Sequence, residues 1–220
     1  MIKLYFLIGV FFISLFVHAQ TTDTMSLRMK QANEWANNDQ KDSAKIAYQA
    51  LMKATKSSKQ ISIFAEASQK LGILLYYEGK HQQALDVYLE AIKYLETQNY
   101  LKGIADLYNE LATLYKKHKD YALADSYFRK ALTYAQQIND FEGIGNASNN
   151  LCLLFRETQN YSQALLWGNR GLENYQKAHS LVGQGYSLEY IGGVYGMMKK
   201  PTLAEKYLLQ SLEIRLKQQD

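Results

Sequence analysis

The sequence predicts an all-α protein built from repeated helical hairpins, and three observations support this fold class. The 220 residues contain one proline, the residue that most strongly interrupts helices. Apolar residues recur at spacings of three and four, which is the period of an amphipathic helix. The whole pattern repeats every forty residues without a gap. Such repeats bury their apolar faces by stacking, so we expect one continuous core along the stack.

The first twenty residues differ from the rest of the chain. Lys3 gives a positive start, an apolar run from Leu4 to Val17 follows, and Val17 and Ala19 are small residues suited to a signal peptidase. A membrane-spanning helix usually needs about 20 apolar residues, which is longer than this run. The pattern predicts a signal peptide over residues 1–19, with an uncleaved N-terminal anchor as the alternative.

The signal pattern implies export, and we expect a bacterial, periplasmic protein that is soluble after cleavage. The sequence has no second apolar run long enough to span a membrane.

Loss of Lys3 lowers the net charge from +4 to about +3, which is too weak to predict nucleic-acid binding. Cys152 is the only cysteine in the sequence, so no disulfide can form within the chain.

Each forty-residue block divides into two helices separated by a polar turn, such as KHKDY at 117–121. Each helix should have about 17 residues and a length of roughly 25 Å. Pro201 lies where a helix should begin, a position that tolerates proline. Asp140 is placed to cap the helix that follows it. These elements predict a solenoid over residues 20–220, with repeats at about 21–60, 61–100, 101–140, 141–180 and 181–220.

One block carries a recognisable pattern of small and large residues. Its members are Leu111, Ala112, Tyr115, Ala124, Phe128 and Ala131. The pattern resembles the tetratricopeptide repeat signature L-G-x-x-Y…A-x-x-x-F-x-x-A. The period of forty instead of 34, and the missing terminal proline, make it similar to the long repeats of kinesin light chain. Two-helix HEAT repeats are the alternative at this period. The resemblance implies a right-handed α-solenoid.

The small residues of this signature have a packing role. Two helices approach to about 8 Å only where small side chains face each other. We therefore expect Ala112 and Ala124 at the helix crossing, with Tyr115 and Phe128 filling the volume beside it. Cys152 occupies the same position as Ala112 in the next block, so we interpret it as a packing residue.

The sequence carries no pattern typical of an enzyme or a metal site. His81, His118 and His179 fall at turns or helix ends, far in sequence from other metal-ligating residues. The glycines between 183 and 196 lack the preceding strand and the G-K-[ST] of a phosphate loop. We therefore expect no enzymatic activity and no cofactor. The basic segment 116–119 is interpreted as a helix end and turn, with an acidic surface or nucleic acid as its alternative partner.

The resemblance implies a concave groove lined by one face of each first helix, where a protein or peptide segment would bind. Side-chain amides on this face can pair with an extended backbone, and cations one repeat apart can meet acidic groups. The candidate groove residues are Gln69, Tyr76, Asn109, Lys116, Asn146, Asn149, Arg156 and Glu189.

Two further hypotheses remain open. The repeats resemble the sensory input regions of bacterial signalling regulators, so the chain would be a stand-alone or truncated relative of one. The last helix, at about 201–218, carries an apolar stripe that no later repeat would cover. This stripe predicts a docking patch, including Tyr207, Leu208 and Leu212, that supports a homodimer or a partner.

Overall fold

The computed structural model describes residues 24–58 and 60–217, so the predicted signal peptide lies outside the described residues. Within these ranges the chain forms ten helices and no strand. The first helix covers residues 24–37. The others are α2 (Lys41–Ser58), α3 (Ile61–Tyr77), α4 (His81–Thr97), α5 (Leu101–Lys117), α6 (Tyr121–Gln137), α7 (Phe141–Glu157), α8 (Tyr161–Lys177), α9 (Leu181–Met197) and α10 (Pro201–Leu216).

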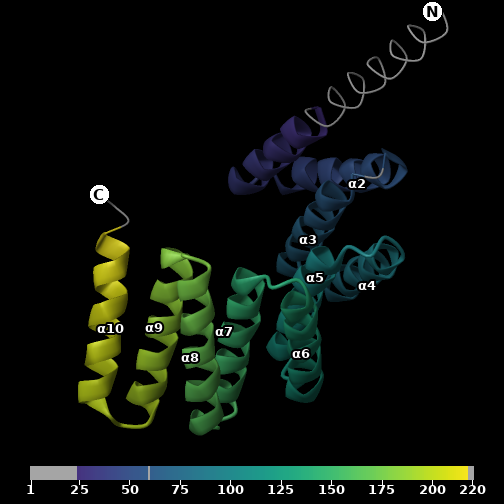
Figure 1. Ribbon diagram of the computed structural model, residues 1–220. Helices are drawn as coiled ribbons and strands as arrows, with labels where there is room; N and C mark the ends of the chain where they lie inside the picture. The colour runs from purple at the N-terminus through teal and green to yellow at the C-terminus, as the bar shows by residue number, and fades with distance from the viewer. Residues whose placement is uncertain (1–23, 59, 218–220) are drawn as a thin grey trace, which may run out of the picture. The chain divides into compact units, whose positions relative to one another are not determined.

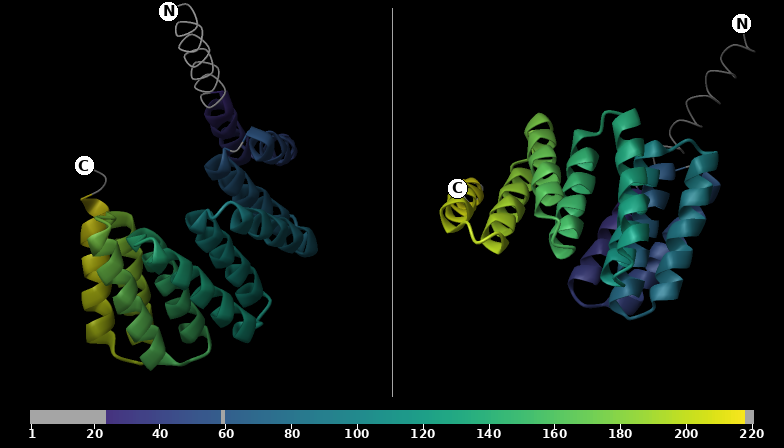
Figure 2. Two further views of the ribbon diagram at one scale, coloured as in Figure 1. Left: turned by 45° about the vertical axis from the view of Figure 1, so that its right-hand side comes forward. Right: turned by 90° about the horizontal axis from the view of Figure 1, so that it is seen from below.

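The chain divides into two compact units, one up to Val87 and one from Tyr88, within α4. In the first unit, α2 packs against α3. In the second unit, α5 to α10 form three consecutive hairpins, and each helix packs against the next (Figure 1, Figure 2). We call the first helix of each hairpin an A helix and the second a B helix. The A helix α7 also contacts α5, and the A helix α9 also contacts α7.

The backbone repeats every twenty residues, which is half the period of the side chains. From α2 onward, a helix begins at residue 41 and then every twenty residues up to Pro201. In each described turn the middle residue has a positive φ, such as 63° at Lys119 and 77° at Gly79. The N–H after it donates to the carbonyl five residues earlier, as Asp120 does to Tyr115 at 3.0 Å. This pattern is a Schellman motif, which ends one helix and immediately starts the next.

Side-chain caps support several of these helix starts. The Asp140 carboxylate accepts a hydrogen bond from the Gly143 N–H, which confirms its predicted capping role. Asp120, Asn160 and Ser180 cap their helices in the same way. Pro201 occupies the first turn of α10, as expected.

The basic segment 116–119 lies at the end of α5 and in the turn after it. Lys116 and Lys117 belong to the last turn of α5, and His118 is its C-cap residue. Cations in this position interact favourably with the helix dipole. The structure thus agrees with the interpretation of this segment as a helix end and turn.

The small residues pack as the signature predicts. Ala112 and Ala124 are fully buried between α5 and α6, and Phe128 is fully buried beside them. Tyr115 is only half-buried, with its ring stacked on Tyr127 at 5.4 Å. Cys152 is also fully buried, and burial raises the pKa of its thiol to about 12. A buried neutral thiol is a packing residue, which confirms the interpretation.

Candidate functional site

The predicted groove residues lie in both units of the chain. Asn109, Lys116, Asn146, Asn149, Arg156 and Glu189 lie on α5, α7 and α9 of the second unit. We call the surface that these A helices present at these positions the A-helix face. Gln69 and Tyr76 lie on α3 of the first unit, and both are half-buried. The Tyr76 ring lies 5.0 Å from the His81 ring.

Between α5 and α7, polar side chains connect the two A helices directly. The Asn150 amide donates to the Asn109 carbonyl oxygen at 3.0 Å. The Lys116 Nζ lies 3.3 Å from a Glu157 carboxylate oxygen, and the Lys116 side chain is only 11% exposed. Lys116 is therefore a neutralised contact between repeats, which corrects its prediction as a cation available to a ligand.

A second ion pair joins the N-terminal ends of α5 and α7. The Lys102 Nζ lies 2.9 Å from the Asp140 carboxylate, which also caps α7. Although burial acts to raise it, the pKa of Asp140 is held below its usual value by the Gly143 N–H and by Lys102. Burial raises the pKa of Asp106, whose carboxylate lies 3.7 Å from the same Lys102. Ion pairs therefore join α5 and α7 at both ends of their contact.

Between α7 and α9, the contact is formed by a buried aromatic ring instead of ion pairs. Tyr175 of α8 is 5% exposed, and its hydroxyl donates to the Asn146 carbonyl oxygen at 2.6 Å. A Cβ atom on Gly145 would lie 2.9 Å from the ring, and one on Gly183 would overlap it. Two glycines on neighbouring A helices therefore make room for the ring. Burial also raises the pKa of Tyr175, so its hydroxyl stays protonated and donates.

Asn149 is buried, which corrects its prediction as an open groove residue. Asn149 is 5% exposed. Its side-chain carbonyl oxygen accepts a hydrogen bond from the Ser187 hydroxyl at 3.0 Å. A Cβ atom on Gly171 would overlap the Asn149 amide, so only glycine fits there. Asn149 therefore fixes the packing of α7, α8 and α9 and is inaccessible to a bound segment.

Arg156 occupies the same repeat position as Lys116 but has a different environment. Its Nη1 atom lies 3.2 Å from the position of a Cβ atom on Gly193. Whereas Lys116 pairs with Glu157, the corresponding residue for Arg156 is Met197, which is 50% exposed. Among residues 24–58 and 60–217, Arg156 forms no ion pair. Its positive charge is therefore not neutralised by a carboxylate of the described residues.

Glu189 is already paired within the hairpin of α9 and α10. Its carboxylate forms an ion pair with Arg215. The Arg215 guanidinium also lies 5.0 Å from the centre of the Tyr186 ring. The charge of Glu189 is thus balanced, and Arg156 remains the distinctive cation of this part of the A-helix face.

The predicted docking patch on α10 is exposed at two of its three residues. Leu208 and Leu212 are 44% and 51% exposed, whereas Phe128 and Leu132 at the same positions of α6 are 0% and 6% exposed. Tyr207 is half-buried, with its ring stacked on Tyr195 at 5.4 Å. Tyr207 thus packs within its own hairpin and is less exposed than the two leucines.

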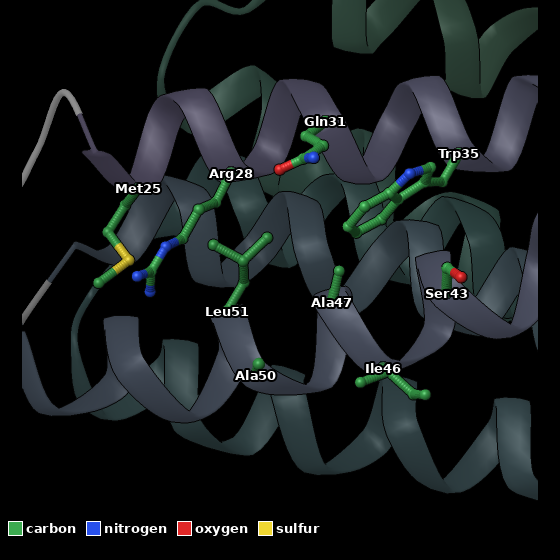
Figure 3. Close-up of a pocket in the computed structure, with 9 residues that line it drawn as sticks. All are labelled: Met25, Arg28, Gln31, Trp35, Ser43, Ile46, Ala47, Ala50 and Leu51. Carbon is green, nitrogen blue, oxygen red and sulfur yellow. The ribbon is translucent and has the colours of Figure 1, made fainter.

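The first unit contains a hollow that the sequence analysis did not predict. It has a volume of about 450 Å³ and lies between the helix at 24–37 and α2 (Figure 3). The Trp35 ring forms one end, Arg28 the other, and Ala47 lies between them. The B helices α6 and α8 carry Tyr127 and Trp167 at the repeat position of Ala47. Small side chains on α2 therefore account for the hollow.

The described part of the chain holds neither a cluster of metal-ligating residues nor a membrane-spanning helix. No group of three or more histidine, cysteine or acidic residues there could hold a metal ion. Likewise, none of the helices from residue 24 to 217 is long and apolar enough to cross a membrane.

Sequence reasoning missed the partners of the groove residues, although a signal for them exists. Asn109 and Asn150 are 41 residues apart, as are Lys116 and Glu157. Asn149 and Ser187 are 38 residues apart, as are Lys102 and Asp140. Residues one full period of 40 apart occupy equivalent positions, whereas the side-chain contacts just described join residues 38 or 41 apart. A search at 38 and 41 would have found the neighbours across adjacent A helices.

Comparisons with known proteins agree with the fold. Residues 103–177 match the tetratricopeptide repeat family model. No curated protein gives a significant match. The structure is similar to that of BtubC (BKLC) from P. vanneervenii, with a TM-score of 0.66, 18% identity, and coverage of 89% of this chain and 90% of that chain.

Two other solved structures extend this likeness. A putative kinesin light chain of Podosopora anserina, with nearly identical TPR-like repeats, has a TM-score of 0.64 and 13% identity, covering 89% of this chain and 96% of that chain. The apo form of RapI has a TM-score of 0.69 and 18% identity, covering 89% of this chain and 55% of that chain. Residues 103–177 therefore match the tetratricopeptide repeat family model, and the described part of the chain has the fold of these repeat structures.

Proposed function

We propose that the chain is an exported scaffold that binds an extended segment of a partner protein on the A-helix face of α7 and α9. Protein binding is the activity that a tetratricopeptide fold suggests, because stacked hairpins create long surfaces suited to it. The observation that supports this particular surface is Arg156, which has no carboxylate partner in the described residues. The ligand would supply an acidic side chain or a terminal carboxylate.

The surroundings of Arg156 suit an approaching peptide. Gly193 and Gly196 stand on α9 where α7 carries Leu153 and Arg156, so these two positions of α9 add no side chain beside Arg156. A Cβ atom on Gly196 would have no neighbour within 4 Å. A guanidinium group binds a carboxylate through two parallel hydrogen bonds, which gives direction as well as charge. Asn146, which is exposed, adds an amide on the same helix.

A peptide array that varies acidic content tests this site. We expect Arg156→Gln to weaken binding of acidic segments by roughly ten-fold or more, since charge-assisted hydrogen bonds contribute about 1.5–3 kcal/mol. The matched control is Lys116→Gln, which removes a cation from the same repeat position where Glu157 already neutralises it. Equal losses in both variants would mean that general positive charge, and not the Arg156 site, holds the ligand.

Export is part of the proposal and has its own test. The signal pattern of residues 1–19 supports it. Cell fractionation and N-terminal sequencing should find the chain outside the cytoplasm and starting near residue 20. Recovery of the intact N-terminus in the membrane fraction would favour the anchor instead, and recovery in the cytoplasm would contradict export.

A further inference from the structure

The surface of α10 exposes a continuous apolar stripe. Leu208, Leu209, Leu212 and Leu216 are 44%, 57%, 51% and 54% exposed. A groove of about 770 Å³ runs beside them, lined also by Glu205 and by Gly196 of α9. Four large aliphatic side chains on one face of one helix form the type of patch that marks an interaction site.

The second unit shows what covers the same surface elsewhere in the stack. On α6 and α8, this surface packs against the next A helix, α7 or α9. A Cβ atom on Gly168 would lie 2.8 Å from the Ile191 side chain, and one on Gly171 would lie 3.4 Å from the Ser187 hydroxyl. The register is antiparallel, because the contact positions rise on α8 as they fall on α9. One repeat later, Leu208 takes the position of Gly168.

We propose that the face of α9 and α10 binds an amphipathic helix supplied by a partner protein, in the place that an A helix occupies elsewhere. The occupant continues an interface that the second unit already uses twice, between α6 and α7 and between α8 and α9. Its chemistry follows from the A helices, whose buried residues recur at i, i+3, i+7 and i+10. In α5 these are Ile104, Leu107, Leu111 and Leu114, which are 1%, 0%, 0% and 6% exposed.

Charge adds a further requirement for the partner helix. Glu205 forms no ion pair among the described residues. The antiparallel register places the C-terminal part of the incoming helix beside it. A basic residue in the last turns of the partner helix would neutralise Glu205 and would also suit that helix's own dipole.

A second copy of this chain fits the surface less well. To supply an A helix, a second copy would have to offer its helix at 24–37. The positions equivalent to the four buried residues of α5 are mostly polar in that helix: Thr24, Leu27, Gln31 and Glu34. In the same register Glu34 would lie opposite Glu205, and like charges repel. An α10–α10 contact would seat the 16-residue helix, about 24 Å long, on a single helix. An A helix instead contacts both helices of the hairpin before it, as α7 contacts α5 and α6.

A peptide with the sequence of residues 101–117 is a suitable probe, because it corresponds to α5, an A helix whose buried apolar residues are known. A lactam between Lys102 and Asp106, whose charged atoms lie 3.7 Å apart in α5, would hold it helical. Fluorescence anisotropy with the full chain should detect binding. Leu212→Lys should weaken it by about ten-fold or more, since central apolar contacts dominate such interfaces.

The controls are matched in exposure and composition. Leu166→Lys changes a leucine of α8 that is 57% exposed and lies outside the stripe, so binding should stay within about two-fold. A probe carrying lysine in place of Leu111 should not bind. The proposal is overturned if the probe does not bind, or if Leu212→Lys leaves binding unchanged. It is also overturned if light scattering finds a dimer that Leu212→Lys makes monomeric, because a second copy then covers the face.

Discussion

The α5–α7 and α7–α9 contacts join equivalent helices of successive repeats but are formed by different side chains. Between α5 and α7, two ion pairs and an amide hydrogen bond join the helices at the surface. Between α7 and α9, the buried Tyr175 ring lies against two glycines, and Asn149 binds Ser187 below the surface. The charges of the first contact are paired with each other. The second contact is buried, and Arg156 beside it has no carboxylate partner among residues 24–58 and 60–217. Successive repeats therefore keep the same helix bounds in sequence, while the side chains between their A helices differ.

The largest expected effect concerns Gly183, because the α7–α9 contact depends on its missing side chain. Gly183→Ala should destabilise the fold by about 2–3 kcal/mol, since the added carbon overlaps the Tyr175 ring. Urea unfolding measures the loss. Gly196→Ala in the same helix is the control, because its Cβ position is open, and it should be neutral or stabilising by up to about 1 kcal/mol.

A double-mutant cycle separates the clash from a general effect on α9. Gly183→Ala combined with Tyr175→Ala should cost less than the sum of the two single changes, because the ring that causes the overlap is gone. Additive costs would mean that Tyr175 and Gly183 do not share this packing site.

The next effect compares two asparagines at the same repeat position. Asn149→Ala should cost about 1–3 kcal/mol, because it removes a buried hydrogen bond and leaves the Ser187 hydroxyl with less compensation. Asn109→Ala should cost about 0.5 kcal/mol, since its partner Asn150 is half-buried and can bind water. Thermal and urea unfolding measure the free energy of unfolding of both variants. Equal decreases would contradict the difference between the buried Asn149 contact and the half-buried Asn109 contact.

Asp140 gives the α5–α7 contact a pH dependence. Its folded pKa is lowered, so it contributes stability above its unfolded value near 3.8 and loses that contribution as the pH falls through the folded value. Asp140→Asn should cost about 1 kcal/mol at neutral pH, where the cap and the Lys102 pair are intact. The difference between wild type and variant should shrink below about pH 4. A difference that persists unchanged at pH 2 would contradict an electrostatic origin.

The smallest effect belongs to the Lys116–Glu157 pair. Lys116→Gln should change the free energy of unfolding by roughly 0.5 kcal/mol or less, because one partner is partly exposed to solvent. The difference should decrease further in high salt, which screens such pairs. A loss of several kcal/mol would show that Lys116 packs as a core residue.

The sequence was sufficient for the helices and turns but not for the inter-repeat contacts. The signature placed Ala112, Ala124 and Phe128 in the core, because their spacing encodes the helix crossing directly. It placed Asn149 wrongly, because an exposed position becomes buried when Gly171 lets a neighbouring helix approach. Such burial depends on residues in three helices at once, and no single spacing reveals it.

The same dependence on several helices explains why the two predicted cations have different environments. Lys116 and Arg156 occupy one repeat position, so the sequence treats them alike. Their difference comes from the residues 41 positions later: Glu157 pairs with Lys116 across adjacent A helices, whereas Met197 at the equivalent position carries no charge. The twenty-residue backbone period was also missed, because the alternating A and B side chains hide it.

The central claim is that Arg156 binds an acidic partner because residue 197 supplies no carboxylate. Met197→Glu tests it most directly, since this change would recreate for Arg156 the pair that Glu157 makes with Lys116. Met197 is 50% exposed, so the fold should tolerate the change. We predict that Met197→Glu weakens acidic-segment binding about as much as Arg156→Gln does, with unfolding free energy unchanged or slightly raised. Undiminished binding by Met197→Glu would contradict the account.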